Sequence, residues 1–169
     1  MINSTNQKTV IFERLPLTAA ELKSMPQAAL TDPFDTAALT VAALCRYPDS
    51  PDDCIAMLNY LRGPRPLSVF ETQFLRDRLM GKPYKPRSYL AGTSPQNNYT
   101  PQTPYSVTVY ENIYSRPQEN YLTLWLESSG ADSPRQVQLR CKPSTGQWFL
   151  WDQMLLADIR IPVEEDPWA

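Results

Sequence analysis

Two hydrophobic periodicities follow one another along this chain, and their order constrains the fold more than any other feature. Apolar residues recur at helical spacing between residues 18 and 80, whereas apolar and polar residues alternate in short segments after residue 106. Helices first and strands afterwards indicate an α+β arrangement in which helices cover one face of a sheet. We therefore predict four short N-terminal helices packed on a C-terminal antiparallel β-meander of about four to five strands.

Helix-start signals support the first part of this prediction. They comprise capping boxes at residues 18–21 and 68–71, and an N-cap residue followed by proline at 32–33 and 50–51. The second predicted helix is apolar nearly all round over residues 37–45, which is typical of a central helix packed on several sides. The fourth predicted helix has apolar residues at helical spacing, namely Phe70, Phe74, Leu75 and Leu79.

Alternation and turn clusters support the second part. Alternating segments lie at residues 106–110, 121–127 and 135–141, and a segment that is bulky on both faces follows at 147–151. Turn-forming residues fill 128–134 and 143–146. Short alternating strands joined by turns favour antiparallel neighbours. Ile159 and Ile161 also alternate, and we expect their segment to pair with one edge of the sheet.

A length of 169 residues predicts a single domain, 1–169. We expect five parts within it. They are a flexible N-terminus at 1–14, a helical half at 15–81, a connector rich in proline and tyrosine at 82–105, an antiparallel sheet at 106–161, and an acidic tail at 162–169.

The connector is the first candidate for an interaction surface. It holds five prolines and four tyrosines, and it shows neither helical spacing nor alternation. Tyrosine and arginine are favoured anchors at protein interfaces. We therefore predict contacts to a partner protein at Arg87, Tyr89, Asn97, Asn98 and Tyr99. The alternative is a loop that only braces the helices against the sheet.

Missing residue types exclude several kinds of catalysis. The chain has no histidine, which excludes Ser-His-Asp and Cys-His catalysis within the chain and every histidine-ligated metal site. Its five scattered glycines form neither a phosphate-binding loop nor a dinucleotide-binding loop. We therefore expect no cofactor and no metal, and we predict a non-catalytic protein-interaction or accessory domain.

The cysteines and the apolar runs suggest a compartment. The three cysteines form no C-x-x-C pair, and neither a secretory signal nor a run of about 20 apolar residues is visible. We expect buried thiols in a reducing cytoplasm and no contact with a membrane.

A small-ligand pocket with an aromatic lining is the alternative function. Trp148 and Trp151 lie in the most aromatic predicted strand, and Trp125 belongs to another strand of the same sheet. A concave sheet would let these three side chains line a pocket in which Asp152 orients the ligand, with weak catalysis as a further option for this pocket. Cross-strand packing explains the same aromatics without any ligand.

A basic window suggests a third function. Residues 62–87 carry seven basic and two acidic side chains, a net charge of +5, beside two tyrosines. Such a window could bind phosphate or single-stranded nucleic acid. The net charge of the whole chain is −2, which disfavours nucleic acid, and salt bridges to the acidic remainder are the alternative.

Six segments carry a resemblance to a known family. They read LTDPFDTAALTVAALCRYP, PLSVFETQFLRDRL, KPRSYLAG, NNYTPQTPY, SGADSPR, and QWFLWDQMLL with DIRIP one residue later. Over roughly residues 15–169 the chain resembles a family of small bacterial proteins of unknown function, and this resemblance implies no catalytic residue. At the level of the fold alone, helices followed by a twisted antiparallel sheet resemble cystatin-like and nuclear-transport-factor-2-like proteins.

Overall fold

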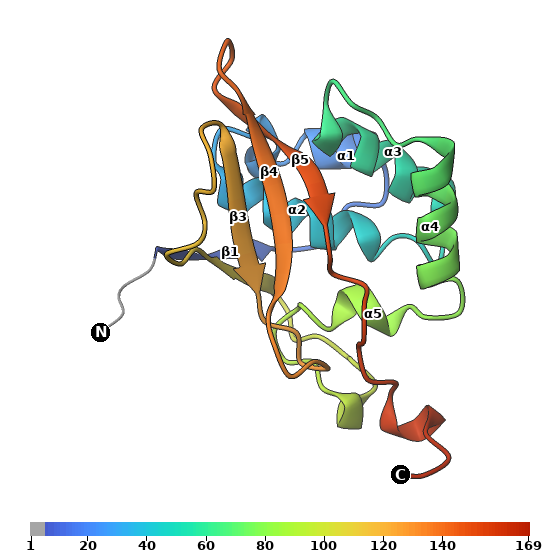
Figure 1. Cartoon of the computed structure of the whole chain (residues 1–169). Helices are drawn as coiled ribbons and strands as arrows, with labels where there is room; N and C mark the ends of the chain where they lie inside the picture. The colour runs from blue at the N-terminus through green and yellow to red at the C-terminus, as the bar shows by residue number, and fades with distance from the viewer. Residues whose placement is uncertain (1–5) are drawn as a thin grey trace.

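The computed structural model describes residues 6–169 and has an α+β fold (Figure 1). Five antiparallel strands form one sheet in the order β1-β2-β3-β4-β5. The strands are β1 (Gln7–Phe12), β2 (Tyr105–Tyr110), β3 (Tyr121–Leu126), β4 (Arg135–Lys142) and β5 (Gln147–Gln153). The helices lie to one side of this sheet, as the α+β prediction requires.

Four predicted helices are present and begin at their predicted caps. They are α1 (Ala19–Lys23), α2 (Pro33–Leu44), α3 (Pro51–Arg62) and α4 (Val69–Leu79). The cap of α4 is reciprocal, because the Glu71 N–H donates to Ser68 Oγ at 3.1 Å and the Ser68 N–H donates to Glu71 Oε1 at 3.0 Å. No helix within residues 6–169 is long and apolar enough to span a membrane.

The prediction of four helices followed by strands misses one element on each side of the helical half, a strand before it and a short helix after it. A fifth short helix, α5 (Tyr84–Arg87), lies in the connector. Three 3₁₀ turns complete the fold: η1 (Pro26–Ala29), η2 (Pro95–Asn97) and η3 (Val163–Glu165).

The first strand corrects the prediction of a flexible N-terminus over residues 1–14. Residues 7–12 pair antiparallel with β2 and form one edge of the sheet, while residues 1–5 lie outside the described part of the chain. Val10 and Phe12 are both 2% exposed, so a short alternation in this segment is enough to bury one strand face. Residues 159–161 form no strand, and the prediction that they pair with an edge is wrong.

Helix α2 lies at the centre of the core, as its apolar sequence predicted. Every residue from Thr36 to Leu44 is buried. The two polar side chains in this run are satisfied, because Thr36 Oγ1 donates to the Trp148 carbonyl at 2.8 Å and Thr40 Oγ1 donates to the Thr36 carbonyl at 2.9 Å. Since buried hydroxyls have partners here, they do not destabilise the helix. The central helix therefore fixes the position of β5, the second edge of the sheet.

Candidate functional site

The connector tyrosines lie in the core rather than on a surface. Tyr89 is 4% exposed and Tyr99 is fully buried. The Tyr89 hydroxyl donates to the Leu155 carbonyl at 2.5 Å, and the Tyr99 hydroxyl donates to the Arg160 carbonyl at 2.6 Å. A side chain in this position meets no partner while the fold is intact. The two tyrosines thus brace the connector against residues 155–160.

The other three predicted contact residues shape the connector. The Asn97 side chain donates to the Gly92 carbonyl at 2.8 Å and accepts from the Ser94 N–H at 2.9 Å. Asn98 has a left-handed backbone with φ of 58°, which asparagine tolerates better than most residues. Arg87 is half-buried, and its Nε has no hydrogen-bond partner within residues 6–169. The two asparagines thus shape the turn of the connector, and the Arg87 side chain lies partly inside the fold.

The predicted tryptophan pocket does not assemble as one cavity. The Trp148 side chain packs against the core, and the Trp148 backbone N–H donates to the Leu30 carbonyl at 2.7 Å. Trp125 pairs with Gln136 and lies on the face of the sheet opposite to Trp148. Of the three tryptophans, only Trp151 lines the cavity beside β5 that is described in the next paragraph. Asp152 lines a second cavity, which adjoins the first one.

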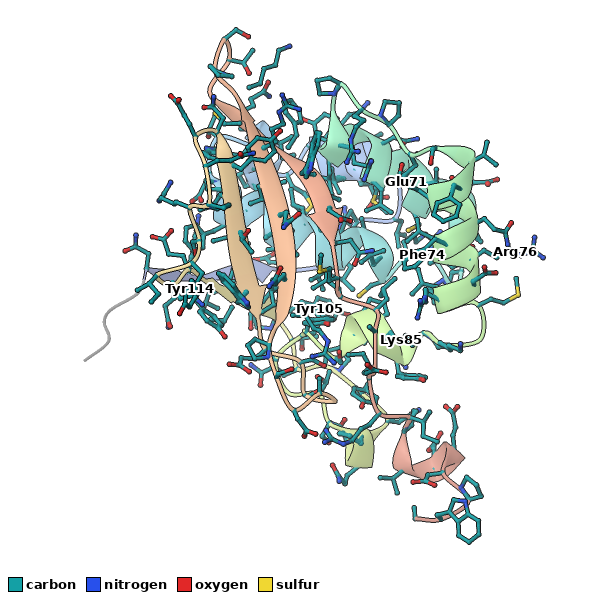
Figure 2. The ribbon with its side chains drawn as sticks, viewed as in Figure 1. Glu71, Phe74, Arg76, Lys85, Tyr105 and Tyr114 are labelled. Carbon is teal, nitrogen blue, oxygen red and sulfur yellow. The ribbon has the colours of Figure 1, made fainter. Side chains whose placement is uncertain are left out.

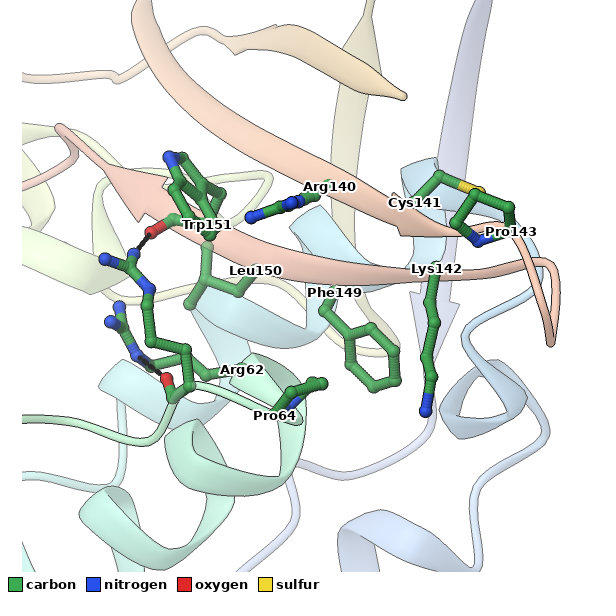
Figure 3. A pocket seen from close by; sticks show the side chains of 10 residues that line it. Arg62, Pro64, Arg140, Cys141, Lys142, Pro143, Phe149, Leu150 and Trp151 are labelled. Carbon is green, nitrogen blue, oxygen red and sulfur yellow. Dashed lines mark hydrogen bonds between the residues drawn. The ribbon is translucent and has the colours of Figure 1, made fainter. Parts of the chain in front are cut away.

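A cavity of about 340 Å³, here called the basic pocket, lies beside β5 (Figure 3). Four cationic side chains line it together with apolar and aromatic ones, and no carboxylate belongs to its lining. The residues are Arg62, Pro64, Arg65, Arg140, Cys141, Lys142, Pro143, Phe149, Leu150 and Trp151. Figure 3 shows Arg140 beside Trp151 and the Lys142 side chain extending past Phe149.

Stacking on Trp151 holds two of these cations. The Arg65 guanidinium carbon lies 3.9 Å from the centre of the Trp151 ring, and that of Arg140 lies 4.8 Å from it. Tyr121 completes the cluster, with its ring 5.6 Å from Trp151 in an edge-to-face arrangement. Cation–π contacts orient guanidinium groups without neutralising their charge. Within residues 6–169, Arg65, Arg140 and Lys142 form no ion pair.

Arg62 has a structural task in the same pocket. It is 5% exposed, its Nε donates to the Arg65 carbonyl at 2.9 Å, and its Nη2 donates to Glu71 Oε2 at 2.9 Å. Burial lowers the pKa of Arg62, and the charge of Glu71 opposes that shift. Burial alone would raise the pKa of Glu71, but hydrogen bonds from Ser68 and the charge of Arg62 lower it. This pair ties the end of α3 to α4 and positions Arg65.

A second cavity, here called the α4–β5 groove, adjoins the basic pocket and shares Arg62 and Leu150 with it. Its volume is about 370 Å³. Its lining comprises Leu58, Arg62, Leu67, Phe70, Glu71, Phe74, Leu75, Leu150, Asp152, Gln153 and Met154. Figure 2 shows Glu71 and Phe74 on the side of α4 that faces β5, and Arg76 on the opposite side.

The apolar residues of α4 divide between the core and this groove. Leu75 and Leu79 are the buried residues of α4, whereas Phe70 is 80% exposed and Phe74 is 39% exposed. Met154 faces them from the end of β5 and is 48% exposed. The spacing of the four α4 residues predicted an apolar face, and within residues 6–169 only Leu75 and Leu79 of that face are buried. Large exposed apolar patches mark interaction or ligand sites.

The predicted basic window does not form one patch. Arg62 and Arg65 line the basic pocket, Arg76 lies across α4 from it, and Lys85 is only 7% exposed. Burial, followed by the charge of Lys82, lowers the pKa of Lys85. The pocket instead recruits Arg140 and Lys142 from β4, which sequence reasoning missed. In β4 the polar residues Gln136, Gln138 and Arg140 alternate with the buried Val137 and Leu139. This alternation indicates that Arg140 lies on the face of the sheet that points away from the core.

Comparison with known proteins identifies a family but no activity. The family model described as "Domain of unknown function (DUF6935)" matches residues 14–163. No curated protein and no solved structure matches the chain, so the likeness to cystatin-like and nuclear-transport-factor-2-like folds stays a prediction. The match covers both cavities and every strand of the sheet except β1, and the chain therefore belongs to this family of domains of unknown function, DUF6935.

Proposed function

We propose that the protein is a non-catalytic interaction domain that binds a partner protein at its α4–β5 surface, meaning the α4–β5 groove together with the basic pocket. The observation that carries this proposal is the open apolar face of α4. Phe70 is 80% exposed and Phe74 is 39% exposed, although a buried position would suit both. The surface thus replaces the connector as the proposed place of contact.

The free energy available at this face is large enough to matter. Covering one exposed phenylalanine removes roughly 150 Å² of apolar surface from water, which is worth about 4 kcal/mol before the costs of association. Phe70 and Phe74 lie one helical turn apart on α4, so one partner segment can cover both. Aromatic residues of this kind dominate the binding energy of many interfaces.

The adjoining charges indicate what the partner carries. Stacking on Trp151 holds Arg65 and Arg140, and Lys142 lies at the wall of the basic pocket. No carboxylate belongs to the lining of this pocket. Complementary charge steers association and suppresses wrong partners. We therefore propose a partner segment that combines apolar side chains with carboxylates. The three free cysteines, which form no disulfide, are in keeping with a cytoplasmic setting for this contact.

Fluorescence polarisation with labelled peptides tests the proposal. The panel contains peptides with aromatic and acidic residues, the same peptides with lysine in place of the acids, and the same peptides with alanine in place of the aromatics. We expect the first set to bind, and we expect Phe70→Ser to weaken binding about tenfold or more. Tyr114→Ser is the matched control, because Tyr114 is 72% exposed on the other side of the molecule (Figure 2). Equal affinity of the wild type and Phe70→Ser would contradict the proposal.

A small anionic ligand in the basic pocket is the second candidate function. It is favoured by one observation, the cationic and aromatic lining without a carboxylate. Calorimetric titration with benzoate and with inorganic phosphate separates the two candidates. Binding that Arg140→Gln removes and Phe70→Ser leaves unchanged would favour the small ligand over a protein partner. Nucleic acid fits less well, because Arg62 and Arg65 line the basic pocket whereas Arg76 lies on the side of α4 that faces away from β5.

A further inference from the structure

Residues 163–169 carry the chemistry that complements the α4–β5 surface. Glu164 and Glu165 are exposed within η3, and Asp166 follows them. Trp168 is 93% exposed, which makes it the most exposed large apolar side chain in residues 6–169. The segment therefore presents two exposed carboxylates, a half-buried third one and an exposed indole. The α4–β5 surface presents exposed phenylalanines beside Arg65, Arg140 and Lys142, which form no ion pair within residues 6–169.

The body of the protein anchors this segment at its start, where η3 contacts η2, and leaves residues 167–169 exposed. Pro162 is buried, and the neighbouring Arg160 carbonyl accepts the Tyr99 hydroxyl at 2.6 Å. Beyond this anchor, seven residues reach at most about 25 Å when extended. Figure 1 shows the chain leaving below α5 and ending away from α4. The same segment is thus better placed to meet a neighbouring molecule than its own groove.

We infer that the α4–β5 surface binds residues 163–169 of a second copy of this chain. Trp168 enters the α4–β5 groove between Phe70 and Met154, and the carboxylates face Arg65, Arg140 and Lys142 in the basic pocket. The exchange is reciprocal, because each copy offers one surface and one segment, and it closes as a two-fold dimer. This inference rests on the proposed function, since it names the partner of the same surface.

The two cavities adjoin each other, so side chains that lie close together in the segment can reach both. Asp166 and Trp168 lie two residues apart, which separates them by about 6 to 7 Å in an extended chain. The two cavities adjoin through Arg62 and Leu150, so neighbouring side chains can occupy both at once.

Charge sets the direction in which the segment lies. The α4–β5 groove contains two carboxylates of its own, Glu71 and Asp152, whereas the basic pocket contains none. Arg62 already neutralises Glu71 through a 2.9 Å ion pair. An acidic side chain would therefore be repelled from the groove by Asp152 and attracted to the pocket. The indole, which carries no charge, is the group that the groove accepts.

Sedimentation velocity of the full chain, from low micromolar to sub-millimolar concentration, tests the inference. We expect a reversible dimer that weakens as the salt concentration rises, because exposed charges are screened. Trp168→Ala is expected to raise the dimer dissociation constant about thirtyfold, as for a central aromatic anchor, and Arg140→Glu should act in the same direction. Tyr114→Ala is the matched control and should leave the dissociation constant unchanged.

Mixing two defective variants gives a sharper readout. Phe70→Ser has a defective α4–β5 surface but an intact segment 163–169, and Trp168→Ala has the reverse. In a dimer of either variant alone, both surface–segment contacts are therefore broken. A mixture of the two restores one contact, and we expect heterodimers where neither variant alone forms dimers. A mixture that remains monomeric while the wild type dimerises would overturn the assignment of these two partners.

The outcomes separate this inference from the proposed function. A wild-type chain that stays monomeric at every concentration overturns self-association, even if a synthetic peptide of residues 162–169 binds to it. Acidic aromatic peptides of other sequence would still bind at Phe70 in that case, and the proposed function would stand. If no peptide binds and the chain is monomeric, both fail.

Discussion

Replacing Tyr99 by alanine tests whether the connector is part of the core. Tyr99 is fully buried, its ring stacks on Tyr84 at 5.6 Å, and its hydroxyl donates to the Arg160 carbonyl. Loss of a buried aromatic ring typically costs about 3 to 5 kcal/mol. Tyr99→Phe keeps the ring and removes one hydrogen bond, which should cost about 1 kcal/mol. Alanine is the right replacement, because glycine would relax the left-handed backbone at φ of 52° and mask part of the loss.

Urea unfolding followed by tryptophan fluorescence measures these losses. We expect midpoints in the order wild type, Tyr99→Phe and Tyr99→Ala, with unchanged m-values. Tyr114→Ala is the control, and at 72% exposure it should cost within about 0.5 kcal/mol. If Tyr99→Ala costs no more than Tyr114→Ala, the connector is not packed as described, and Tyr99 would again be a candidate for contact with a partner.

Three further predictions concern other positions. Gly63→Ala should lower the free energy of unfolding in urea by about 2 kcal/mol or more, because φ is +60° and an added Cβ would collide with the Phe149 ring. A decrease of less than about 0.5 kcal/mol would contradict this reasoning. Burial raises the pKa of the Cys54 thiol, so a thiol reagent should modify the half-buried Cys141 first and Cys54 only on unfolding; equal rates would refute the burial. Burial also raises the pKa of Tyr89 above its unfolded value of 10.0, so the folded state keeps this proton longer. The free energy of unfolding should therefore be unaffected by this group below pH 10.0 and fall above it, and Tyr89→Phe should reduce that fall; an identical fall in the variant would count against it.

Local signals predicted most of the fold because they act over a few residues. The capping box at Ser68 and Glu71 forms in the structure as its spacing indicates, and the leucines of β3 alternate into the core. The first strand was missed because a six-residue strand at a sheet edge needs a distant partner. The chain between β1 and β2 contains the whole helical half and the connector. Pairing of that kind leaves no local mark in the sequence.

The site was predicted only in part, because it depends on contacts between distant residues. The sequence indicated Trp151 for an aromatic pocket and Arg65, within residues 62–87, for binding phosphate or nucleic acid. The two residues are 86 positions apart in the chain, so their stacking at 3.9 Å could not be predicted from the sequence. Periodicity placed Phe70 and Phe74 on an apolar face without indicating that no other element covers them. Tyr89 and Tyr99 were chosen as surface anchors because tyrosine suits both interfaces and cores, and burial decides between the two.

Mapping the bound peptide by NMR tests the central claim most directly. Amide shifts of the full chain would be followed during titration with an acidic, tryptophan-containing peptide. The account predicts that shifts concentrate in residues 65–75, 140–142 and 149–154, which form the α4–β5 surface. Shifts concentrated in residues 84–105, or no shifts at peptide concentrations that saturate binding by polarisation, would contradict it.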